Sequence, residues 1–376
     1  MRVLIAGGGT GGHLFPGIAV AEEVTTRDTR NEVLFVGTDR GLEARVVPAY
    51  GWPLEVIQVQ GLKGKGVGGL LRSLMQLPRA LADSIRILRR WQPDVVLGVG
   101  GYASGPVVLA AWLLRLPTAV QEQNALPGLT NRILGMFVSR VFVAFEEARA
   151  SFPVDKVVLI GNPIRRKLMD NYLSGSVSHA HFTVLVVGGS LGARGLNQRV
   201  IEALPHLADL KDVLRFVHQT GKTSIDEVRA GYEAAGIQGE VVEFIDDMSA
   251  AYETAELVVC RAGATTLAEL TVCKKASILV PFPHATDNHQ EVNAKALVEE
   301  GAAVMFREAE LTGERLAEEI RALYQDPARR KKMEKRASRL GRPEAAKELA
   351  DVCVELMQAA WGPKGREREA EGEARS

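Results

Sequence analysis

Short apolar runs of strand length alternate with helical patterns along most of the chain. Runs of this kind are typical of a parallel sheet that helices cover on both faces. The predicted strands of the first half are Val3–Ala6, Val33–Gly37, Val95–Gly98, Thr118–Gln121 and Val141–Ala144. The pattern restarts with Phe182–Val187, Leu214–His218, Val241–Phe244, Leu257–Cys260 and Ser277–Val280. The fold class is therefore α/β, with two doubly wound parallel-sheet domains.

The tripeptide Gly-Asn-Pro at 161–163 is the predicted joint between the halves, because Asn-Pro is a turn signal. One domain then occupies residues 1–162 and the other residues 163–341. A further helical pattern covers Glu344–Trp361. The remaining tail, 362–376, is charged and has no periodicity, which is typical of disorder.

Charge and cysteine content exclude several classes of protein. The 46 basic residues balance the 46 acidic ones, which argues against a general nucleic-acid binder. The three cysteines lack metal-type spacing, so neither a zinc site nor a disulfide framework is expected. The most apolar long stretch, 105–120, is interrupted by Arg115 and Pro117 and is too short to span a bilayer. We expect a cytoplasmic protein.

A glycine-rich loop, AGGGTGGHLFP at 6–16, follows the first predicted strand. Glycines let the chain turn tightly and let a ligand approach the backbone, and the helix that follows directs N–H groups toward an anion. The pattern Gly7-x-Gly9-x-x-Gly12 is by itself only a weak dinucleotide signal. His13 at the helix start is a candidate base. Alternatively, the glycines only permit close packing and His13 only bonds the loop.

The second half carries three polar motifs. GNPIRRK places Arg165 where a guanidinium can clamp a diphosphate, or where it is simply a solvated cation. GGSLGARGLN offers Ser190 at a second glycine loop. In RAGATTLAEL, Thr266 and Glu269 fit a capping box, and the alternative is a Glu269 carboxylate that binds ribose hydroxyls. No metal site is evident, and the Asp-Asp pair at 246–247 is interpreted as a helix N-terminus.

Eight motifs occur in the order in which the MurG family has them. They are GGGTGGHLFPGIAVA, GGYASGP, QEQNALPGLTN, GNPIR, GGSLGARGLN, EFIDDM, RAGATTLAEL and DNHQEVNA. The chain therefore resembles this bacterial branch of glycosyltransferase family 28 over nearly all of residues 1–361. The resemblance implies the GT-B fold, two Rossmann-like domains that face each other across a cleft. The N-terminal domain would bind acceptor and membrane, the C-terminal one UDP-GlcNAc, and helix 344–361 would pack back on the first.

The activity that the resemblance implies is an inverting transfer of GlcNAc from UDP-GlcNAc. The acceptor would be the 4-hydroxyl of undecaprenyl-pyrophosphoryl-MurNAc-pentapeptide, so that lipid I becomes lipid II in peptidoglycan synthesis. Neither a cofactor nor a metal is implied. Partners among cell-wall or division proteins would connect the enzyme to cell shape and division.

Site residues are carried over motif by motif. His13 is similar to the family's candidate base, and Glu122 is a second candidate on the acceptor side. Arg165 and Ser190 would hold the donor phosphates, and Ile245 would read the uracil. Glu269 would bind the ribose, and Gln290 the GlcNAc hydroxyls. The full donor-binding set is Thr10, Gly11, Gly12, Asn124, Arg165, Ser190, Ile245, Ala264, Thr265, Thr266, Leu267, Ala268, Glu269 and Gln290.

A basic stretch at 61–91 bears on where such an enzyme works. Seven cations and one acid, Asp83, are interleaved with leucines and a methionine. The cations are Lys63, Lys65, Arg72, Arg79, Arg86, Arg89 and Arg90. Basic residues around exposed apolar ones suit an anionic membrane surface, and the alternative is an amphipathic helix with a solvated basic face. With the resemblance, peripheral docking on the cytoplasmic side of the inner membrane is expected.

Three other functions remain open at this point. A GT-B transferase with another lipid acceptor would share the second half, but GGYASGP and QEQNALPGLTN argue against it. A non-catalytic UDP-sugar-binding module would lack His13 and Glu122, which are both present. An NAD-dependent dehydrogenase rests on the first glycine loop alone.

Overall fold

The computed structural model describes residues 1–59, 67–173, 181–189 and 192–362. The chain divides into two compact units. Unit 1 consists of Met1–Pro163 with Glu344–Ser376, and unit 2 is Ile164–Pro343. Among the predicted features, Ser190, Lys63, Lys65 and the tail from residue 363 lie outside the described residues.

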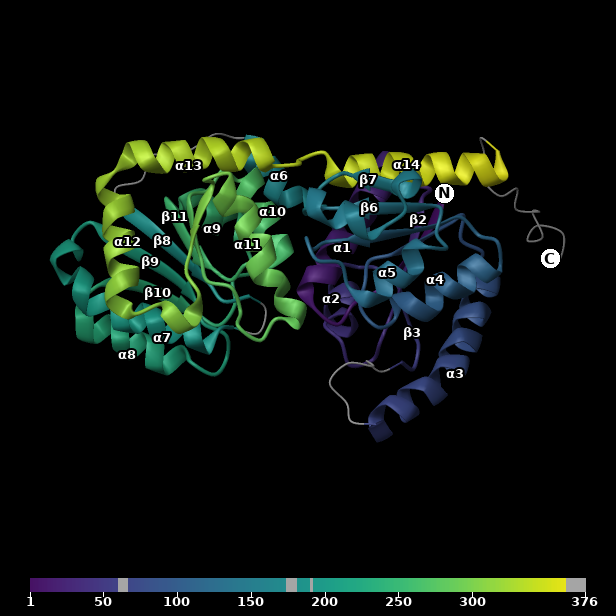
Figure 1. Ribbon diagram of the computed structural model, residues 1–376, viewed down its shortest axis with the longest axis horizontal. Coiled ribbons are helices and arrows are strands. Elements are labelled where there is room, and N and C mark those ends of the chain that lie inside the picture. Colours follow the sequence, from purple (N-terminus) through teal and green to yellow (C-terminus); the bar gives the residue numbers. More distant parts are fainter. Residues whose placement is uncertain (60–66, 174–180, 190–191, 363–376) are drawn as a thin grey trace. The chain divides into compact units, whose positions relative to one another are not determined.

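Unit 1 is built on a parallel seven-stranded sheet in the order β3-β2-β1-β4-β5-β6-β7 (Figure 1). Its strands are β1 Arg2–Ala6, β2 Glu32–Gly37, β3 Leu54–Val56, β4 Val95–Gly98, β5 Thr118–Glu122, β6 Arg140–Val143 and β7 Val157–Leu159. The central strand β1 pairs with both β2 and β4, and its residues from Val3 to Ala6 are fully buried. This explains why its sequence is continuously apolar.

Helices cover both faces of this sheet. They are α1 Gly11–Arg27, α2 Glu43–Ala49, α3 Val67–Trp91, α4 Ser104–Leu113, α5 Leu129–Gly135 and α14 Ala345–Trp361. Helices α1 and α14 contribute to one core layer, and α3 and α4 contribute to the other. Helices α1 and α4 follow the adjacent strands β1 and β4 but cover opposite faces, so the direction of the chain connections changes between these two strands, at the carboxyl edge of the sheet. Such a switch point is where ligands bind in open α/β sheets.

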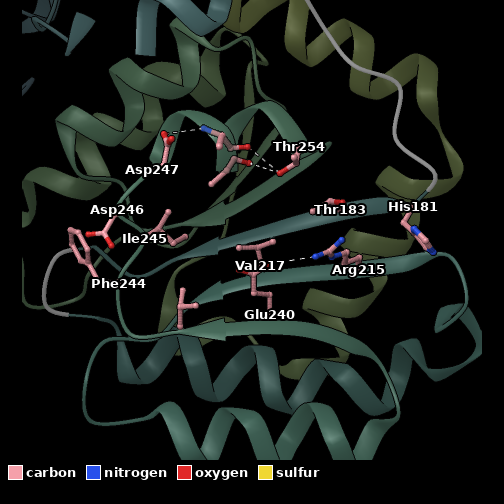
Figure 2. Close-up of a pocket in the computed structure, with 13 residues that line it drawn as sticks. His181, Thr183, Arg215, Val217, Glu240, Phe244, Ile245, Asp246, Asp247 and Thr254 are labelled. Atoms are coloured by element: carbon pink, nitrogen blue, oxygen red, sulfur yellow. Dashed lines mark hydrogen bonds and ion pairs between the residues drawn. The ribbon is translucent and has the colours of Figure 1, made fainter. Parts of the chain in front are cut away.

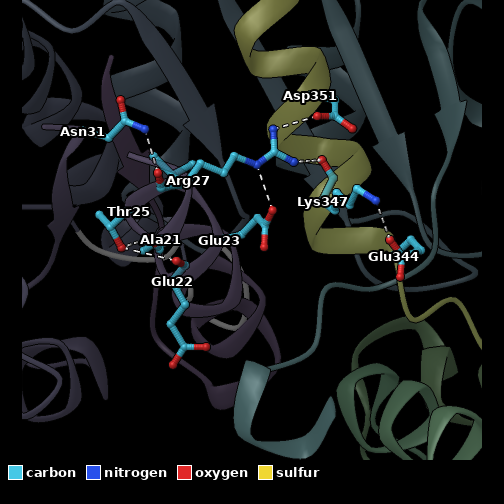
Figure 3. A network of polar contacts seen from close by, with 10 residues as sticks. Ala21, Glu22, Glu23, Thr25, Arg27, Asn31, Glu344, Lys347 and Asp351 are labelled. Atoms are coloured by element: carbon cyan, nitrogen blue, oxygen red, sulfur yellow. Dashed lines mark hydrogen bonds and ion pairs between the residues drawn. The ribbon is translucent and has the colours of Figure 1, made fainter. Parts of the chain in front are cut away.

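The last helix, α14, packs on α1 within unit 1. Its residues Leu349 and Cys353 are fully buried in the shared core. Figure 3 shows the polar contact at the rim, where Arg27 of α1 donates to Asp351 Oδ1 at 2.7 Å and to the Lys347 carbonyl oxygen at 2.8 Å. Apolar burial and an ion pair therefore hold α14 against α1.

Unit 2 repeats the plan with a parallel six-stranded sheet, in the order β10-β9-β8-β11-β12-β13. The strands are β8 Phe182–Val187, β9 Leu214–Gln219, β10 Gln238–Val242, β11 Leu257–Cys260, β12 Ser277–Leu279 and β13 Ala303–Met305. The helices are α6 Arg166–Leu173, α7 Arg194–Ala203, α8 Ile225–Ala235, α9 Met248–Thr254, α10 Ala264–Val272, α11 His289–Glu299, α12 Gly313–Gln325 and α13 Pro327–Leu340. Two doubly wound parallel-sheet domains were predicted, and the structure confirms them.

The differences from the predicted elements lie mainly at the sheet edges. The sequence pattern missed β3, β7 and β13, which have three residues each and form edges of the two sheets. Strand β10 was predicted at 241–244 but occupies Gln238–Val242, because its register pairs Gln238 with Arg215. Among the described residues, no helix is long and apolar enough to cross a bilayer.

Candidate functional site

The first two glycines of the loop after β1 are required by packing. A Cβ at Gly7 would lie 2.5 Å from the Gly100 carbonyl oxygen, and one at Gly8 would lie 2.3 Å from the Glu43 carboxyl carbon. From the other side, a Cβ at Gly101, whose φ is +79°, would lie 2.3 Å from the Gly8 carbonyl oxygen. The loops that follow β1 and β4 therefore pack backbone against backbone at the switch point.

The later glycines of the same loop leave room for a ligand. Gly9 and Thr10 are exposed, and a Cβ at Gly9 would meet no described atom within 4 Å. At Gly12 the nearest described atom would be Thr10 Oγ1 at 3.8 Å. Helix α1 begins at Gly11, with Thr10 as its N-cap. The positive end of a 17-residue helix thus opens onto accessible backbone, which is a ready place for an anion.

His13 stands in the first turn of α1 at the junction of these two loops. Its Nδ1 lies 3.3 Å from Thr10 Oγ1. A Cβ at Gly100 would lie 2.7 Å from His13 Cδ2, so the ring rests directly against the Gly100 backbone. The ring is half-buried and fixed by a hydroxyl on one side and by a glycine on the other. The structure thus holds a titratable imidazole beside the accessible start of α1.

Glu122, at the end of β5, is buried and fully engaged. Its Oε1 accepts hydrogen bonds from the backbone N–H of Asn124 at 3.0 Å and from Asn124 Nδ2 at 3.3 Å. Its Oε2 accepts from the Gly128 N–H at 3.1 Å and from Asn131 Nδ2 at 2.9 Å. Burial raises the pKa of this carboxyl above its ordinary value. These contacts tie the loop after β5 to helix α5 and bring Asn124 to Glu122.

In unit 2, Arg165 and Glu269 meet although 104 positions separate them. Arg165 Nη2 lies 3.3 Å from Glu269 Oε1, and the Tyr252 hydroxyl donates to Glu269 Oε2 at 3.0 Å. Both charged side chains are largely buried. Burial raises the pKa of Glu269, although the Arg165 charge opposes this. The site therefore holds a positive and a negative group that are both removed from water.

Helix α10 supplies the segment that was assigned to the nucleotide. It begins at Ala264 after the N-cap Gly263, so Thr266 lies inside the first turn. The capping-box interpretation of Thr266 and Glu269 is therefore wrong, because the helix begins earlier than that pattern requires. Thr266 and Ala268 are half-exposed, whereas Thr265 and Leu267 are buried.

Ile245 lines a cavity of about 550 Å³ in unit 2 (Figure 2). The cavity extends over residues of β8, β9 and β10 and is bounded by the segment 244–247 and helix α9. Asp247 is the N-cap of α9 and accepts from the Ala250 N–H at 3.3 Å, which confirms the predicted helix N-terminus. Lys167 Nζ lies 2.8 Å from Asp247 and lowers its pKa.

Gln290 is in the first turn of α11. Its Oε1 accepts from the Phe282 N–H at 2.9 Å, so the side chain holds the loop that leads into this helix. Asp287 and Asn288, immediately before the helix, have left-handed φ values of +52° and +57°. Gln290, which was predicted to bind the sugar, thus also holds the loop that precedes its own helix.

Two buried polar residues escaped the sequence analysis. The first is Glu43, whose carboxyl group lies against Gly8 of the first glycine loop. Gln219 accepts from the Gly188 N–H at 3.1 Å and donates to the carbonyl oxygens of Gly189 and Glu243, each at 3.1 Å. It thereby joins the start of the second glycine loop to the segment before Ile245. The signal that could have identified Gln219 is its place as a polar residue directly after the predicted strand Leu214–His218.

Family models match both halves of the chain. The glycosyltransferase family 28 N-terminal domain matches residues 3–143, and the glycosyltransferase family 28 C-terminal domain matches residues 183–349. A relative from Myxococcus xanthus is 71% identical over 98% of this chain and 96% of its own length. The chain belongs to glycosyltransferase family 28. It is thus a glycosyltransferase, as predicted.

The relatives carry one name. The Myxococcus protein and one from Anaeromyxobacter, 64% identical over all of this chain and 99% of its own, are both called UDP-N-acetylglucosamine–N-acetylmuramyl-(pentapeptide) pyrophosphoryl-undecaprenol N-acetylglucosamine transferase. Among solved structures, MurG of Acinetobacter baumannii superposes with a TM-score of 0.76 at 32% identity, covering 94% of this chain and 99% of that one. The GT-B fold predicted for this glycosyltransferase is confirmed.

A more distantly related solved structure shares the fold of this chain, but its low identity carries no information on function. UDP-GlcNAc 2-epimerase from Neisseria meningitidis, bound to UDP-GlcNAc, superposes with a TM-score of 0.67 over 94% of this chain and all of that one. Its identity to this glycosyltransferase is only 14%. The two therefore share the architecture alone.

Proposed function

We propose that this glycosyltransferase converts lipid I into lipid II in peptidoglycan synthesis. It transfers GlcNAc from UDP-GlcNAc to undecaprenyl-pyrophosphoryl-MurNAc-pentapeptide. The observation that carries the proposal is the 71% identity over 98% of the chain to a protein named for this transfer. The match covers nearly the whole chain, so it includes both units.

The two units take different parts of the reaction. Unit 1 receives the lipid-linked acceptor, and unit 2 holds the UDP portion of the donor. Support comes from where the candidate residues lie, since His13 and Glu122 belong to unit 1 and Arg165, Glu269 and Gln290 to unit 2. From unit 1, the residues Thr10–Gly12 and Asn124 contact the GlcNAc end of the donor.

Donor binding uses the paired groups of unit 2. Arg165 binds the diphosphate, which its contact with Glu269 allows because a guanidinium has five N–H donors. Glu269 accepts hydrogen bonds from the ribose hydroxyls. The segment Ala264–Glu269 lines the nucleotide, Ile245 reads the uracil and Gln290 binds the GlcNAc hydroxyls. Ser190 keeps its assigned phosphate role as a proposal from the family motif.

The chemistry is one displacement at the anomeric carbon. The acceptor 4-hydroxyl attacks C1 of GlcNAc from the face opposite UDP, the bond from C1 to the diphosphate breaks, and an α donor gives a β product. His13 takes the hydroxyl proton, and Arg165 stabilises the negative charge that develops on the diphosphate. Glu122 positions the loop after β5, because its two oxygens already accept four hydrogen bonds.

Membrane docking is the part of the proposal that concerns location. Helix α3 carries Arg79, Arg86, Arg89 and Arg90 in its described part and packs against α4. Exposed apolar side chains lie on α4 and α5 and just beyond them, and the rings of Trp112 and Phe137 contact each other there at a tilted angle, with centroids 5.0 Å apart. The apolar set is Trp112, Leu113, Leu129, Ile133, Met136 and Phe137. Cations beside an apolar patch suit peripheral attachment to an anionic inner leaflet.

Links to cell shape, to cell division and to other cell-wall proteins belong to the same proposal. They follow from the pathway in which the enzyme works. Attachment at the cytoplasmic side of the inner membrane brings the enzyme to its lipid-linked acceptor.

The proposal is tested by UDP release with a soluble short-chain analogue of lipid I. We expect release only when the analogue is present. His13→Ala should lower turnover about 10²–10⁴-fold with UDP binding unchanged, as for loss of a general base. Glu122→Gln should lower turnover less. A larger loss for Glu122→Gln, with UDP binding unchanged, would make Glu122 the base. UDP-GlcNAc binding without any acceptor-dependent release would favour a binding module.

A further inference from the structure

Glu43 is a buried carboxylate enclosed by glycines. It is the first residue of α2, and it is 1% exposed. Three glycines surround its carboxyl group, since Cβ atoms at Gly8, Gly37 and Gly41 would each lie within 2.5 Å of a Glu43 side-chain atom. Two of these glycines flank the loop after β2, whereas Gly8 belongs to the loop after β1. The backbone of both loops therefore closes around this one side chain.

The carboxylate connects the two loops by hydrogen bonds. Its Oε1 accepts from the backbone N–H of Thr38 at 2.9 Å and from Thr38 Oγ1 at 2.8 Å. Its Oε2 accepts from the Gly9 N–H at 2.7 Å. Each oxygen thus serves a different loop, and both act as acceptors. Glutamine has the same size but only one acceptor oxygen, so it can satisfy one loop and not the other.

Gly9 and Thr10 connect Glu43 to the candidate base His13. Gly9 is exposed, and no described atom would lie within 4 Å of a Cβ there, so side-chain packing does not hold it. Thr10 follows as the N-cap of α1, and its hydroxyl lies 3.3 Å from His13 Nδ1. A short, charge-assisted hydrogen bond therefore fixes the backbone immediately before the residue that orients His13.

We propose that Glu43 is a positioning residue of the transferase. It holds Gly9, and through Gly9 it sets Thr10 and His13 for the acceptor hydroxyl. This role rests on the proposed function. It also gives the glycine run a second purpose, because Gly8 has no side chain so that the Glu43 carboxylate can occupy that space.

The test measures acceptor-dependent UDP release for Glu43→Gln, His13→Ala and the double variant. We expect Glu43→Gln to lower kcat at least 10-fold with the Kd for UDP unchanged, because the groups of unit 2 that hold UDP are not altered. Since Glu43 acts through His13, the double variant should be no slower than His13→Ala alone. A purely structural role would lower the rate of the His13→Ala enzyme by the same factor.

The matched control is Asp94→Asn. Asp94 is also a buried acid, and it accepts from the Arg2 N–H at 2.7 Å, at the opposite end of β1 from the glycine loop. We expect this variant to lose stability with kcat unchanged. Thr38→Val is the milder variant if tryptophan fluorescence shows that Glu43→Gln does not fold. It removes one of the hydrogen bonds to Oε1, and its smaller loss should also disappear in the His13→Ala background.

The outcomes separate this role from the function on which it rests. Wild-type enzyme without acceptor-dependent release would overturn the proposed transfer, and the role of Glu43 with it. Wild-type turnover combined with an unchanged kcat in Glu43→Gln, or with losses that multiply in the double variant, would overturn the role of Glu43 alone.

Discussion

Replacing Arg165 with methionine tests the electrostatics of the donor site. The substitution removes the guanidinium 3.3 Å from Glu269 and leaves a carboxylate of which only 8% of the side chain is exposed. Breaking a buried pair in this way costs about 3–5 kcal/mol, because one charge is left uncompensated. The hydrogen bond from Tyr252 remains, and the pair is not short, so we expect the lower end, about 3 kcal/mol.

The loss must be measured in unit 2 itself. All four tryptophans, at 52, 91, 112 and 361, lie in unit 1, so their fluorescence does not report on this site. Hydrogen exchange of the β8 and β11 amides does, since these paired strands form the centre of the second sheet. Arg165→Met should lower their opening free energy by the stated amount. It should also weaken UDP binding.

The double-mutant cycle with Glu269→Gln decides whether the charge is the cause. In the Glu269→Gln background, Arg165→Met should cost much less, because no buried charge remains. The pH dependence has a definite sign as well. Burial raises the pKa of Glu269 in the folded state, so the free energy of unfolding falls as the pH rises above about 4.3, the pKa of an unfolded glutamate. The stability that Arg165→Met loses should therefore become smaller as the pH is lowered, because Glu269 is then protonated and uncharged. Equal losses in both backgrounds, with coupling under about 0.5 kcal/mol, would refute the reasoning.

Three further substitutions test the fold that supports the site. Arg27→Ala should destabilise unit 1 by about 1 kcal/mol, as measured by urea unfolding followed by tryptophan fluorescence, and this loss should be smaller at high salt. Arg30→Ala, which removes an exposed ion pair, should change the stability little. By the same assay, Gly101→Ala should cost at least about 2 kcal/mol, since its Cβ would clash with the Gly8 carbonyl, and Gly105→Ala on α4 should be tolerated. Burial lowers the pKa of His218 to about 3, so unit 2 should lose stability below about pH 6.5, by up to about 1.4 kcal/mol per pH unit. His218→Gln should reduce this dependence of the unfolding free energy on pH, as measured by circular dichroism. An unchanged dependence would contradict the lowered pKa of His218 as its cause.

The fold was predictable because its central strands are buried on both faces. Continuous apolar runs such as β1 and β8 are visible in any window of the sequence. The edge strands β3, β7 and β13 are not visible, because three residues carry too little periodicity. The capping-box alternative at Thr266 placed the start of the helix too late, because the same residue pattern can also occur inside a helix that begins earlier.

The candidate site was predictable only where chemistry follows a glycine loop. His13 and Arg165 stand directly after turn signals, so residue type and place suggest a role. The contact between Arg165 and Glu269 joins positions 104 residues apart, and no local pattern contains it. The role of Glu43 is even harder to predict from the sequence, because it accepts hydrogen bonds from backbone N–H groups, which almost every residue has.

The most direct test of the central claim is the structure of the product. Enzyme, UDP-GlcNAc and the soluble lipid I analogue are incubated, and the product is analysed by mass spectrometry and proton NMR. We expect one added N-acetylhexosamine, linked β to the 4-hydroxyl of the muramyl sugar, with one UDP released for each linkage formed. An α linkage would contradict the single displacement, and UDP released into water without a disaccharide product would contradict the transferase.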